Sequence, residues 1–181
     1  MKTTPLVLAR ALTLVGALLA GSPALLAQSA TPDAAKPDST VIFAASDFDG
    51  VSERALQAMR SRAEELHIRG VAVVAYSAGD SLSSWSSRMV VVGRMIETPS
   101  ATNTKGSNLL GVAYAKASEM ASTLKDSGKL ERPVMIGEFG WQGGVVARGK
   151  TGILIAAFSG GRSEDDVSTS KAGLSVLSSS L

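Results

Sequence analysis

The 181-residue chain contains no cysteine, a single histidine and few aromatic residues, and each shortage removes a class of function. Without cysteine there is no disulfide framework, no thiolate-bound zinc or iron–sulfur cluster, no c-type haem attachment and no cysteine nucleophile. One histidine excludes a metal centre built from several imidazoles. Aromatic residues make up 4% of the chain, which leaves few platforms for stacking the bases of single-stranded nucleic acid.

An excess of charge of one sign is also lacking. The chain has 18 basic and 16 acidic residues, and Lys2 and Arg10 are the only charged residues among the first 27. The remaining chain therefore carries 16 basic residues (18 less these two) and 16 acidic ones, and its formal charge is zero. Because binding to a nucleic-acid backbone needs an excess of Lys and Arg, we expect no nucleic-acid partner.

Residues 1–27 have the layout of a signal peptide. Lys2 and Arg10 form a cationic start, residues 11–20 are apolar, and small residues follow a Gly-Ser-Pro break up to Ala27. The apolar run is shorter than the ~20 residues that a membrane-spanning helix needs. We therefore expect cleavage after Ala27, a product without a membrane anchor, and a periplasmic or secreted location; an uncleaved anchor helix is the alternative.

The rest of the chain divides into an arm and one domain. Residues 28–40 are polar and contain two prolines, which is typical of a flexible arm, and a single domain is expected over residues 41–181. Three segments have the residue pattern of helices: 51–66, 108–124 and 163–177. Shorter apolar runs predict strands: 41–45, 71–76, 82–92, 134–136, 145–148 and 153–158. Acidic residues 164–166 open the last helix, where the helix dipole favours anions, and are expected to be solvated.

The connections between the middle strands are short turns. Short turns join antiparallel strands, whereas parallel strands need long crossovers. The sequence therefore predicts an α+β domain with a central, mostly antiparallel sheet flanked by helices.

Residues 144–151 read GVVARGKT, which matches the phosphate-loop pattern G-x-x-x-x-G-K-T. That loop binds phosphate because it leads into the N-terminus of a helix. Here Val145 and Val146 favour a strand, and the sequence that follows, ILIAAF, favours another. We interpret the segment as a hairpin turn rather than a nucleotide site.

Two Ser-x-x-Lys pairs and a Lys-Thr-Gly triplet match part of the signature of penicillin-recognising enzymes. Ser122 lies near the end of one expected helix and Ser168 lies inside another, whereas the nucleophile of those enzymes opens its helix. The Ser-Asp-Asn triplet is missing from the sequence. A serine nucleophile needs a neighbouring base, and no such pair occurs at a recognisable spacing, so an enzyme is not the favoured class.

His67 is the only imidazole, and two interpretations of it stay open. It follows the first expected helix (EELHIRG), where the C-terminal helix dipole favours a histidine. It is also the one imidazole that can hold a haem iron or another metal ion, and Tyr76 and Tyr114 are further possible ligands of haem iron.

Several stretches share an order of turns and helices. The last part of the domain has a Gly-Gly turn (Gly143 and Gly144), two strands, a Ser-Gly-Gly turn and an acidic helix start. Residues 113–121 read AYAKASEMA, with Lys116 between Ala115 and Ala117. From residue 51 onward, these features resemble the GlcG/HbpS family of haem-binding proteins, which is related to the C-terminal domain of PduO-type proteins.

The resemblance implies a profilin-like α+β domain that forms homo-oligomers and binds haem or another tetrapyrrole. It implies a cofactor site at Lys116, Gly143 and Gly144. Trp141 lies in the segment where family members carry histidine and asparagine. Residues 78–81 (AGDS) occupy the turn where family members often carry a histidine.

Together the residues and the resemblance predict an exported, non-enzymatic binding protein for haem or a similar flat ligand. The candidate cofactor-binding residues are His67, Tyr76, Lys116, Trp141, Gly143 and Gly144, with His67 as the candidate metal ligand. One alternative is a structural or partner-binding oligomeric module without haem, and another is a small hydrolase or isomerase.

Overall fold

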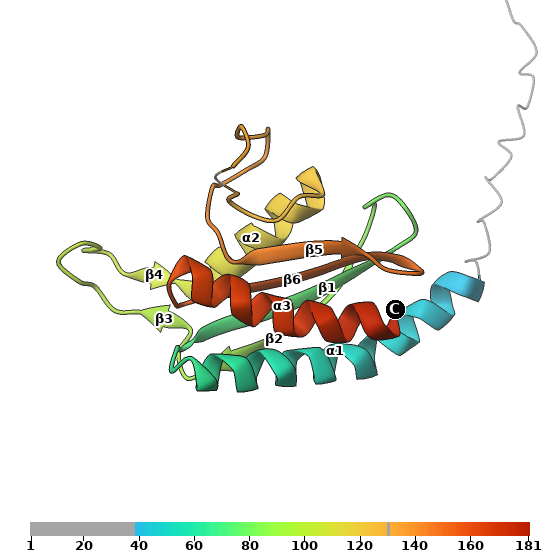
Figure 1. Ribbon diagram of the computed structural model, residues 1–181, viewed down its shortest axis with the longest axis horizontal. Coiled ribbons are helices and arrows are strands. Elements are labelled where there is room, and N and C mark those ends of the chain that lie inside the picture. The colour runs from blue at the N-terminus through green and yellow to red at the C-terminus, as the bar shows by residue number, and fades with distance from the viewer. Residues whose placement is uncertain (1–38, 130) are drawn as a thin grey trace, which may run out of the picture. The chain divides into compact units, whose positions relative to one another are not determined.

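The computed structural model describes the backbone of residues 39–129 and 131–181. The expected signal peptide and residues 28–38 of the expected arm lie outside the described residues. In chain order, the elements are α1 (Ser39–Glu65), β1 (Gly70–Ala78), β2 (Ser86–Val92), β3 (Ile96–Glu97), β4 (Ser107–Asn108), α2 (Leu109–Thr123), β5 (Gly144–Arg148), β6 (Gly152–Ser159) and α3 (Ser163–Ser180) (Figure 1).

Four antiparallel strands form the main sheet in the order β2-β1-β6-β5. Val73 in β1 lies opposite Met89 in β2 and opposite Ala157 in β6. β3 and β4 form a separate two-stranded ribbon. The expected strand at residues 82–92 is confirmed from Ser86 onward. The α+β class and the antiparallel sheet predicted from the sequence are confirmed, and the profilin-like arrangement stays a prediction.

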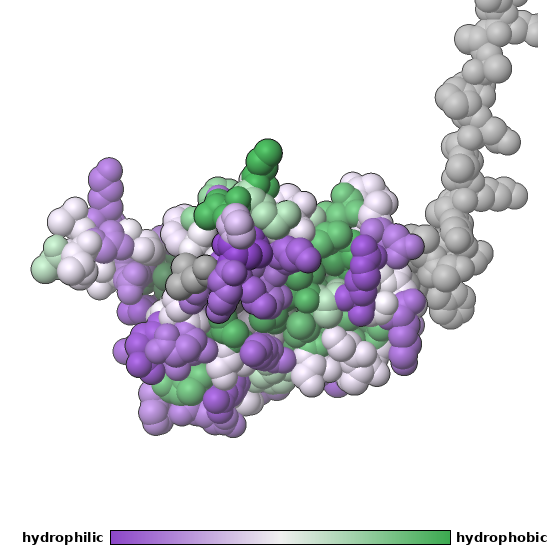
Figure 2. Space-filling model, turned by 45° about the horizontal axis from the view of Figure 1, so that its top comes forward, coloured by the Kyte–Doolittle hydropathy of each residue, from purple (hydrophilic) through white to green (hydrophobic). Residues whose placement is uncertain are grey.

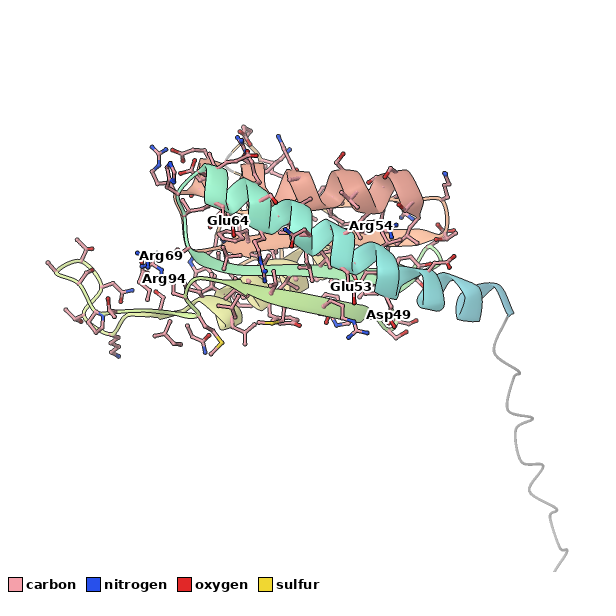
Figure 3. All side chains as sticks on the ribbon, turned by 90° about the horizontal axis from the view of Figure 1, so that it is seen from below. Asp49, Glu53, Arg54, Glu64, Arg69 and Arg94 are labelled. Carbon is pink, nitrogen blue, oxygen red and sulfur yellow. The ribbon has the colours of Figure 1, made fainter. Side chains whose placement is uncertain are left out.

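Helices cover both faces of the sheet. α1 and α3 pack on one face and on each other, and α2 packs on the opposite face against β1 and β6. Figure 3, which views the molecule from below, shows α1 and α3 running across the same face. Among the described residues, no helix combines the length and apolar character that a membrane crossing needs.

The two central strands are buried on both faces, which explains their continuous apolar sequences. Alternate side chains point to opposite faces of a strand. One set packs with α1 and α3: Ala72, Val74, Tyr76, Leu154, Ala156 and Phe158. The other set packs with α2: Val71, Val73, Ala75, Ile153, Ile155 and Ala157.

The segment that matches a phosphate loop is the predicted β-hairpin. The Gly149 N–H donates to the Gly152 carbonyl oxygen at 2.8 Å and closes the turn between β5 and β6. The Lys150 N–H donates to the oxygen of Leu181 at 2.7 Å. β6 follows Thr151 directly, so no helix N-terminus faces the Gly-Lys-Thr triplet.

Two of the expected strands are wrong. Residues 41–45 belong to α1, which begins before them rather than near residue 51, and a short apolar run does not distinguish strand from helix by its period alone. Residues 134–136 form no strand. Val134 is 80% exposed and Ile136 fully exposed, so this apolar run has no layer to pack against.

Candidate functional site

A cleft with a volume of about 490 Å³ lies where α2, residues 140–142 and the turn between β6 and α3 meet. Small-molecule sites range over roughly 300–1,000 Å³, so the cleft has the size of a ligand pocket. Leu109 and Val112 of α2 and the ring of Trp141 supply its apolar surface. The polar residues of its lining include Glu97, Ser107, Gln142 and Ser163. We call this cleft the Trp141 pocket.

Lys116 and Asp166 form a buried ion pair in the lining of the Trp141 pocket. The Lys116 Nζ donates to Asp166 Oδ2 at 2.8 Å and to the Phe158 carbonyl oxygen at 2.7 Å. Asp166 Oδ1 accepts a hydrogen bond from the Gly161 N–H at 2.8 Å. The two side chains are only 4% and 5% exposed. The pair therefore ties α2, the end of β6 and the start of α3 together beneath the pocket.

Burial shifts the pKa of both partners. Loss of hydration lowers the pKa of Lys116, and the carboxylate of Asp166 opposes that change. Loss of hydration raises the pKa of Asp166, and the ammonium of Lys116 opposes that change. The expectation that residues 164–166 are solvated is wrong for Asp166, because its carboxylate is directed to Lys116 and the Gly161 N–H.

Gly143 passes directly beside the ion pair. Its φ is +126°, and a Cβ atom there would lie 2.5 Å from Lys116 Nζ and 2.8 Å from Asp166 Cβ. Its carbonyl oxygen accepts from the Phe158 N–H at 3.0 Å and from Ser170 Oγ at 2.6 Å. Both the backbone angle and the space therefore require glycine at this position.

Gly144 starts β5 next to the same cluster. Its N–H donates to Ser127 Oγ at 2.8 Å, and a Cβ atom there would lie 2.4 Å from the methyl carbon of Met120. Gly143 and Gly144 thus bring β5 close to α2 and α3, and neither lines the Trp141 pocket.

Trp141 lies at the pocket on the loop that connects α2 to β5 (residues 124–143), which we call the α2–β5 loop. Its ring stacks on Phe139 with the ring centroids 5.8 Å apart and the planes 17° apart. Trp141 is 48% exposed and Phe139 56% exposed. Two stacked, half-exposed aromatic rings, one of which lines a cleft, are characteristic of a binding surface rather than of a core.

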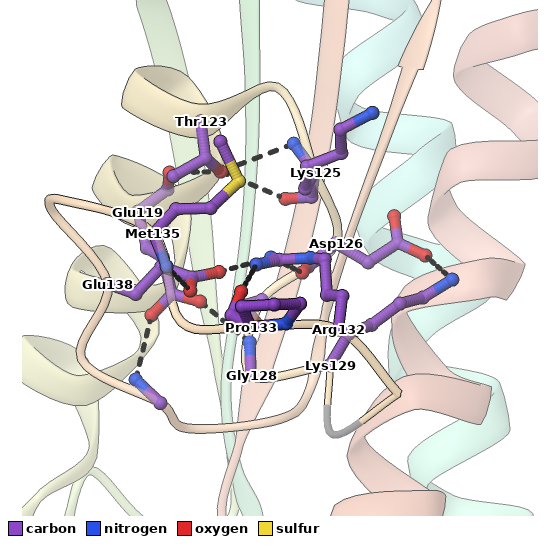
Figure 4. A network of polar contacts seen from close by, with 12 residues as sticks. Glu119, Thr123, Lys125, Asp126, Gly128, Lys129, Arg132, Pro133, Met135 and Glu138 are labelled. Carbon is purple, nitrogen blue, oxygen red and sulfur yellow. Dashed lines mark hydrogen bonds and ion pairs between the residues drawn. The ribbon is translucent and has the colours of Figure 1, made fainter.

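Glu119 holds the α2–β5 loop on α2 (Figure 4). Its side chain is fully buried. Glu119 Oε1 accepts from the Gly128 N–H at 2.6 Å, and Oε2 accepts from the N–H groups of Phe139 and Gly140 at 2.8 and 3.1 Å. One carboxylate therefore bonds to both limbs of the loop.

A second pair, Arg132 with Glu138, lies farther out in the same loop (Figure 4). The Glu138 carboxylate also accepts from the Met135 N–H. The hydrogen bond from Arg132 holds the pKa of Glu138 below its ordinary value of 4.5, and the bond from Met135 adds to this shift. The outer part of the loop is thus fixed by polar contacts.

The structure places His67 outside the Trp141 pocket. His67 is exposed and has a φ of +56°. The His67 N–H donates to the Glu64 carbonyl oxygen at 3.0 Å. The Ile68 N–H donates to the Ala63 carbonyl oxygen at 2.9 Å. These two bonds define a Schellman motif that ends α1. Within residues 47–129 and 131–181, no three His, Asp or Glu side chains converge on a point that could hold a metal ion.

Tyr76 also lies away from the pocket. It is buried on the side of the sheet that faces α1 and α3, where its ring stacks on Phe48 at 5.8 Å. Its hydroxyl lies 3.1 Å from Thr151 Oγ1. Of the candidate residues, the structure brings Lys116 and Trp141 together in one pocket with Gly143 and Gly144 behind it, and it separates His67 and Tyr76 from them.

Two buried carboxylates of the candidate site, those of Glu119 and Asp166, were not among the residues predicted from the sequence. A signal for Glu119 is nevertheless present. Lys116 and Glu119 lie on the same side of α2 as Ala113, Ala117 and Met120, all of which are buried. Charged residues within the apolar stripe of a helix are almost never fully buried unless paired, so their spacing indicates partners in the core.

Comparison of the sequence with known protein families and with characterised proteins finds no match. The resemblance to the GlcG/HbpS family therefore depends on the residue patterns alone.

Proposed function

We propose that the chain is an exported, non-enzymatic binding protein that holds a flat organic molecule, such as haem or another tetrapyrrole, in the Trp141 pocket. The observation that supports this most is the stacked and exposed Phe139–Trp141 pair beside a cleft of about 490 Å³. A flat ligand placed against the Trp141 ring removes apolar surface from water, and each Å² contributes about 25 cal/mol. Binding of this kind does not require a side chain that coordinates a metal ion at the centre of the ligand.

The pocket is better suited to contact the flat face of such a ligand than to coordinate an iron at its centre. Among the described residues that line it, there is no histidine, methionine or tyrosine. The Lys116 amine is already bonded to Asp166 and to the Phe158 carbonyl oxygen. A porphyrin is therefore expected to bind through its face, with or without iron.

The pocket offers little for hydrolysis. Ser107, Ser159 and Ser163 line it, but the chain's one histidine, His67, is not part of the lining. A serine without a free neighbouring base is a weak nucleophile, and Lys116, the lysine of the lining, is bonded to Asp166 and to the Phe158 carbonyl oxygen. This arrangement favours a binding protein over the hydrolase or isomerase that the sequence left open.

Titration of the exported chain with hemin and with metal-free protoporphyrin tests the proposal. We expect both to bind, with dissociation constants within about threefold of each other because the iron has no ligand in the pocket. We also expect both to quench the emission of Trp141 in a Trp85→Phe variant. The matched Trp141→Phe variant, which keeps the half-buried Trp85 outside the pocket, should bind both ligands more weakly.

Three results would overturn the proposal. An absorption spectrum of hemin unchanged by the protein, together with unquenched Trp141, would exclude binding of this class. Binding by Trp141→Phe as tight as that by the wild type would place the ligand elsewhere. Binding of hemin far tighter than that of metal-free protoporphyrin would show an iron ligand, and His67→Ala would then identify or exclude that imidazole.

A second candidate function, a partner-binding or self-associating module, is favoured by the outer part of the α2–β5 loop. Figure 2 shows an apolar projection at the top of the molecule. Val134 and Ile136, in this loop, are 80% and 100% exposed, and exposed apolar residues that gather on one surface mark interaction sites. We propose that, in this case, the paired Val134→Ser and Ile136→Ser changes lower the mass measured by sedimentation, whereas Ile96→Ser, at an exposed residue of β3, does not.

A further inference from the structure

We infer that Glu119 is the positioning residue of the Trp141 pocket: its buried carboxylate clamps the α2–β5 loop and thereby sets the place of Trp141. This inference rests on the proposed function for the ligand that the pocket takes. The clamp itself follows from contacts that exist without any ligand.

The first support is the chemistry around the carboxylate. Glu119 is fully buried, yet within the described residues no Lys or Arg side chain forms an ion pair with it. Its partners are three backbone N–H groups, those of Gly128, Phe139 and Gly140. A buried carboxylate loses its hydration at a large cost, and charge-assisted hydrogen bonds are the contacts strong enough to offset it. The loop and the carboxylate therefore stabilise each other.

The second support is the position of the three donors. Gly128 lies on the outgoing limb of the loop, and Phe139 and Gly140 lie on the returning limb, directly before Trp141. The two limbs touch, because a Cβ atom on Gly128 would lie 2.5 Å from the Gln142 nitrogen and 2.6 Å from the Trp141 carbonyl carbon. The Glu119 carboxylate thus joins the two limbs of the loop at the residues directly before Trp141.

The third support is the exposure of the apolar residues around the aromatic pair. Val134, Ile136 and Phe139 are mostly exposed, so burial of apolar surface does little to hold this part of the loop. Lys116 and Glu119 are one turn apart on α2 and share a face. The same rigid helix therefore carries the base of the pocket and the clamp that holds Trp141 over it.

Glu119→Gln tests the clamp. Glutamine has nearly the same size but only one acceptor oxygen, and its NH₂ group would face N–H donors on the other side. Because Oε1 serves Gly128 and Oε2 serves Phe139 and Gly140, at least one limb is released. Glu131→Gln is the matched control, since Glu131 is exposed in the same loop.

Hydrogen exchange of the backbone amides is the first readout. We expect the amides of Gly128, Phe139 and Gly140 to exchange at least about tenfold faster in Glu119→Gln, the factor for one lost charge-assisted hydrogen bond. Amides of β1 and β6 should keep their rates, and Glu131→Gln should match the wild type. Unchanged exchange in Glu119→Gln would overturn the inference.

The second readout concerns Trp141. In the Trp85→Phe background, Glu119→Gln should make the Trp141 emission more accessible to iodide and weaken binding of metal-free protoporphyrin about tenfold. Faster exchange with unchanged Trp141 emission would show that the clamp does not set the place of Trp141, and would overturn the inference. Failure of the wild type to bind protoporphyrin would refute the proposed function, and the exchange and emission readouts would still decide the clamp.

If Glu119→Gln does not fold, hydrogen exchange of the wild type decides whether Glu119 holds the α2–β5 loop. In the unaltered chain the Phe139 and Gly140 amides should be protected, whereas the amide of the fully exposed Ile136 should exchange fast. Equal, fast exchange of all three would contradict the clamp.

Discussion

The two loops that flank β5 differ in what their sequences suggest and in what they do. The turn between β5 and β6 completes a phosphate-loop pattern that begins in β5, yet it is a hairpin turn closed by the hydrogen bond between Gly149 and Gly152. The α2–β5 loop matches no motif, yet it carries Trp141 to a pocket and is held by the buried Glu119. The difference shows that a motif carries its chemistry only in its structural context, and that a charge within an apolar helix face is the better indicator of a built site.

The largest expected effect concerns the ion pair beneath the pocket. Lys116→Met keeps the length of the side chain but leaves the Asp166 carboxylate buried without its cation, which costs about 3–5 kcal/mol of unfolding free energy. Urea unfolding measures this loss. The double variant Lys116→Met, Asp166→Leu should recover much of it, because no unpaired charge remains; a double variant as unstable as the single one would contradict the role assigned to the pair.

A smaller effect is expected at the glycines of the α2–β5 loop. Gly143→Ala combines a positive φ with contacts to Lys116 and Asp166, and we expect about 2–4 kcal/mol of destabilisation from strain and overpacking together. Gly140→Ala is the control, because its φ is +79° but nothing lies within 4 Å of the added Cβ. It should cost about 1–2 kcal/mol, from the backbone angle alone. Equal losses in the two variants would show that the packing around Gly143 is not tight.

The outer part of the same loop should respond to acid. The pKa of Glu138 is held below 4.5 by Arg132 and Met135. A depressed pKa in the folded state means that the contribution of Glu138 is present above the ordinary pKa and is lost as pH falls through the lowered value. The protection factor of the Met135 amide, which is its intrinsic exchange rate divided by its measured rate at the same pH, should therefore fall in acid in the wild type. In Glu138→Gln this protection factor should be low already at neutral pH and should change little in acid.

The smallest effect is expected in the β5–β6 turn. Lys150→Ala removes the lysine of the phosphate-loop pattern, but its side chain forms no ion pair within the described residues. Its unfolding free energy should stay within about 0.5 kcal/mol of the wild type. Calorimetric titration with ATP should show no binding to the wild type or to Lys150→Ala. Binding by the wild type that is lost in Lys150→Ala would show that the β5–β6 turn is a binding site after all.

The sequence correctly predicted the elements in which the spacing of the apolar residues matches the burial of their side chains. β1, β6, α2 and the β5–β6 hairpin follow from apolar runs, helical spacing and turn glycines. It misassigned residues 41–45 and 134–136, because an apolar run contains no information on whether another layer covers it. Only the fold reveals that the first run is part of α1 and that, within the part of the chain that the structure describes, the second run is exposed.

The candidate site was predictable in part. Of the candidate residues, Lys116 and Trp141 line one pocket and Gly143 and Gly144 lie behind it, whereas His67 ends a helix and Tyr76 packs on Phe48. Asp166 approaches Lys116 from 50 residues away, and the bonds of Glu119 reach 9 to 21 residues along the chain. Contacts of that range depend on how the layers assemble, so local patterns do not contain them.

Hydrogen exchange of the wild-type chain with and without metal-free protoporphyrin tests the central claim most directly. If the Trp141 pocket takes a flat ligand, exchange should slow in residues 139–142 and in the turn at residues 159–163, and stay unchanged around His67. Slowing confined to the end of α1 around His67, or no slowing at saturating ligand, would contradict the account.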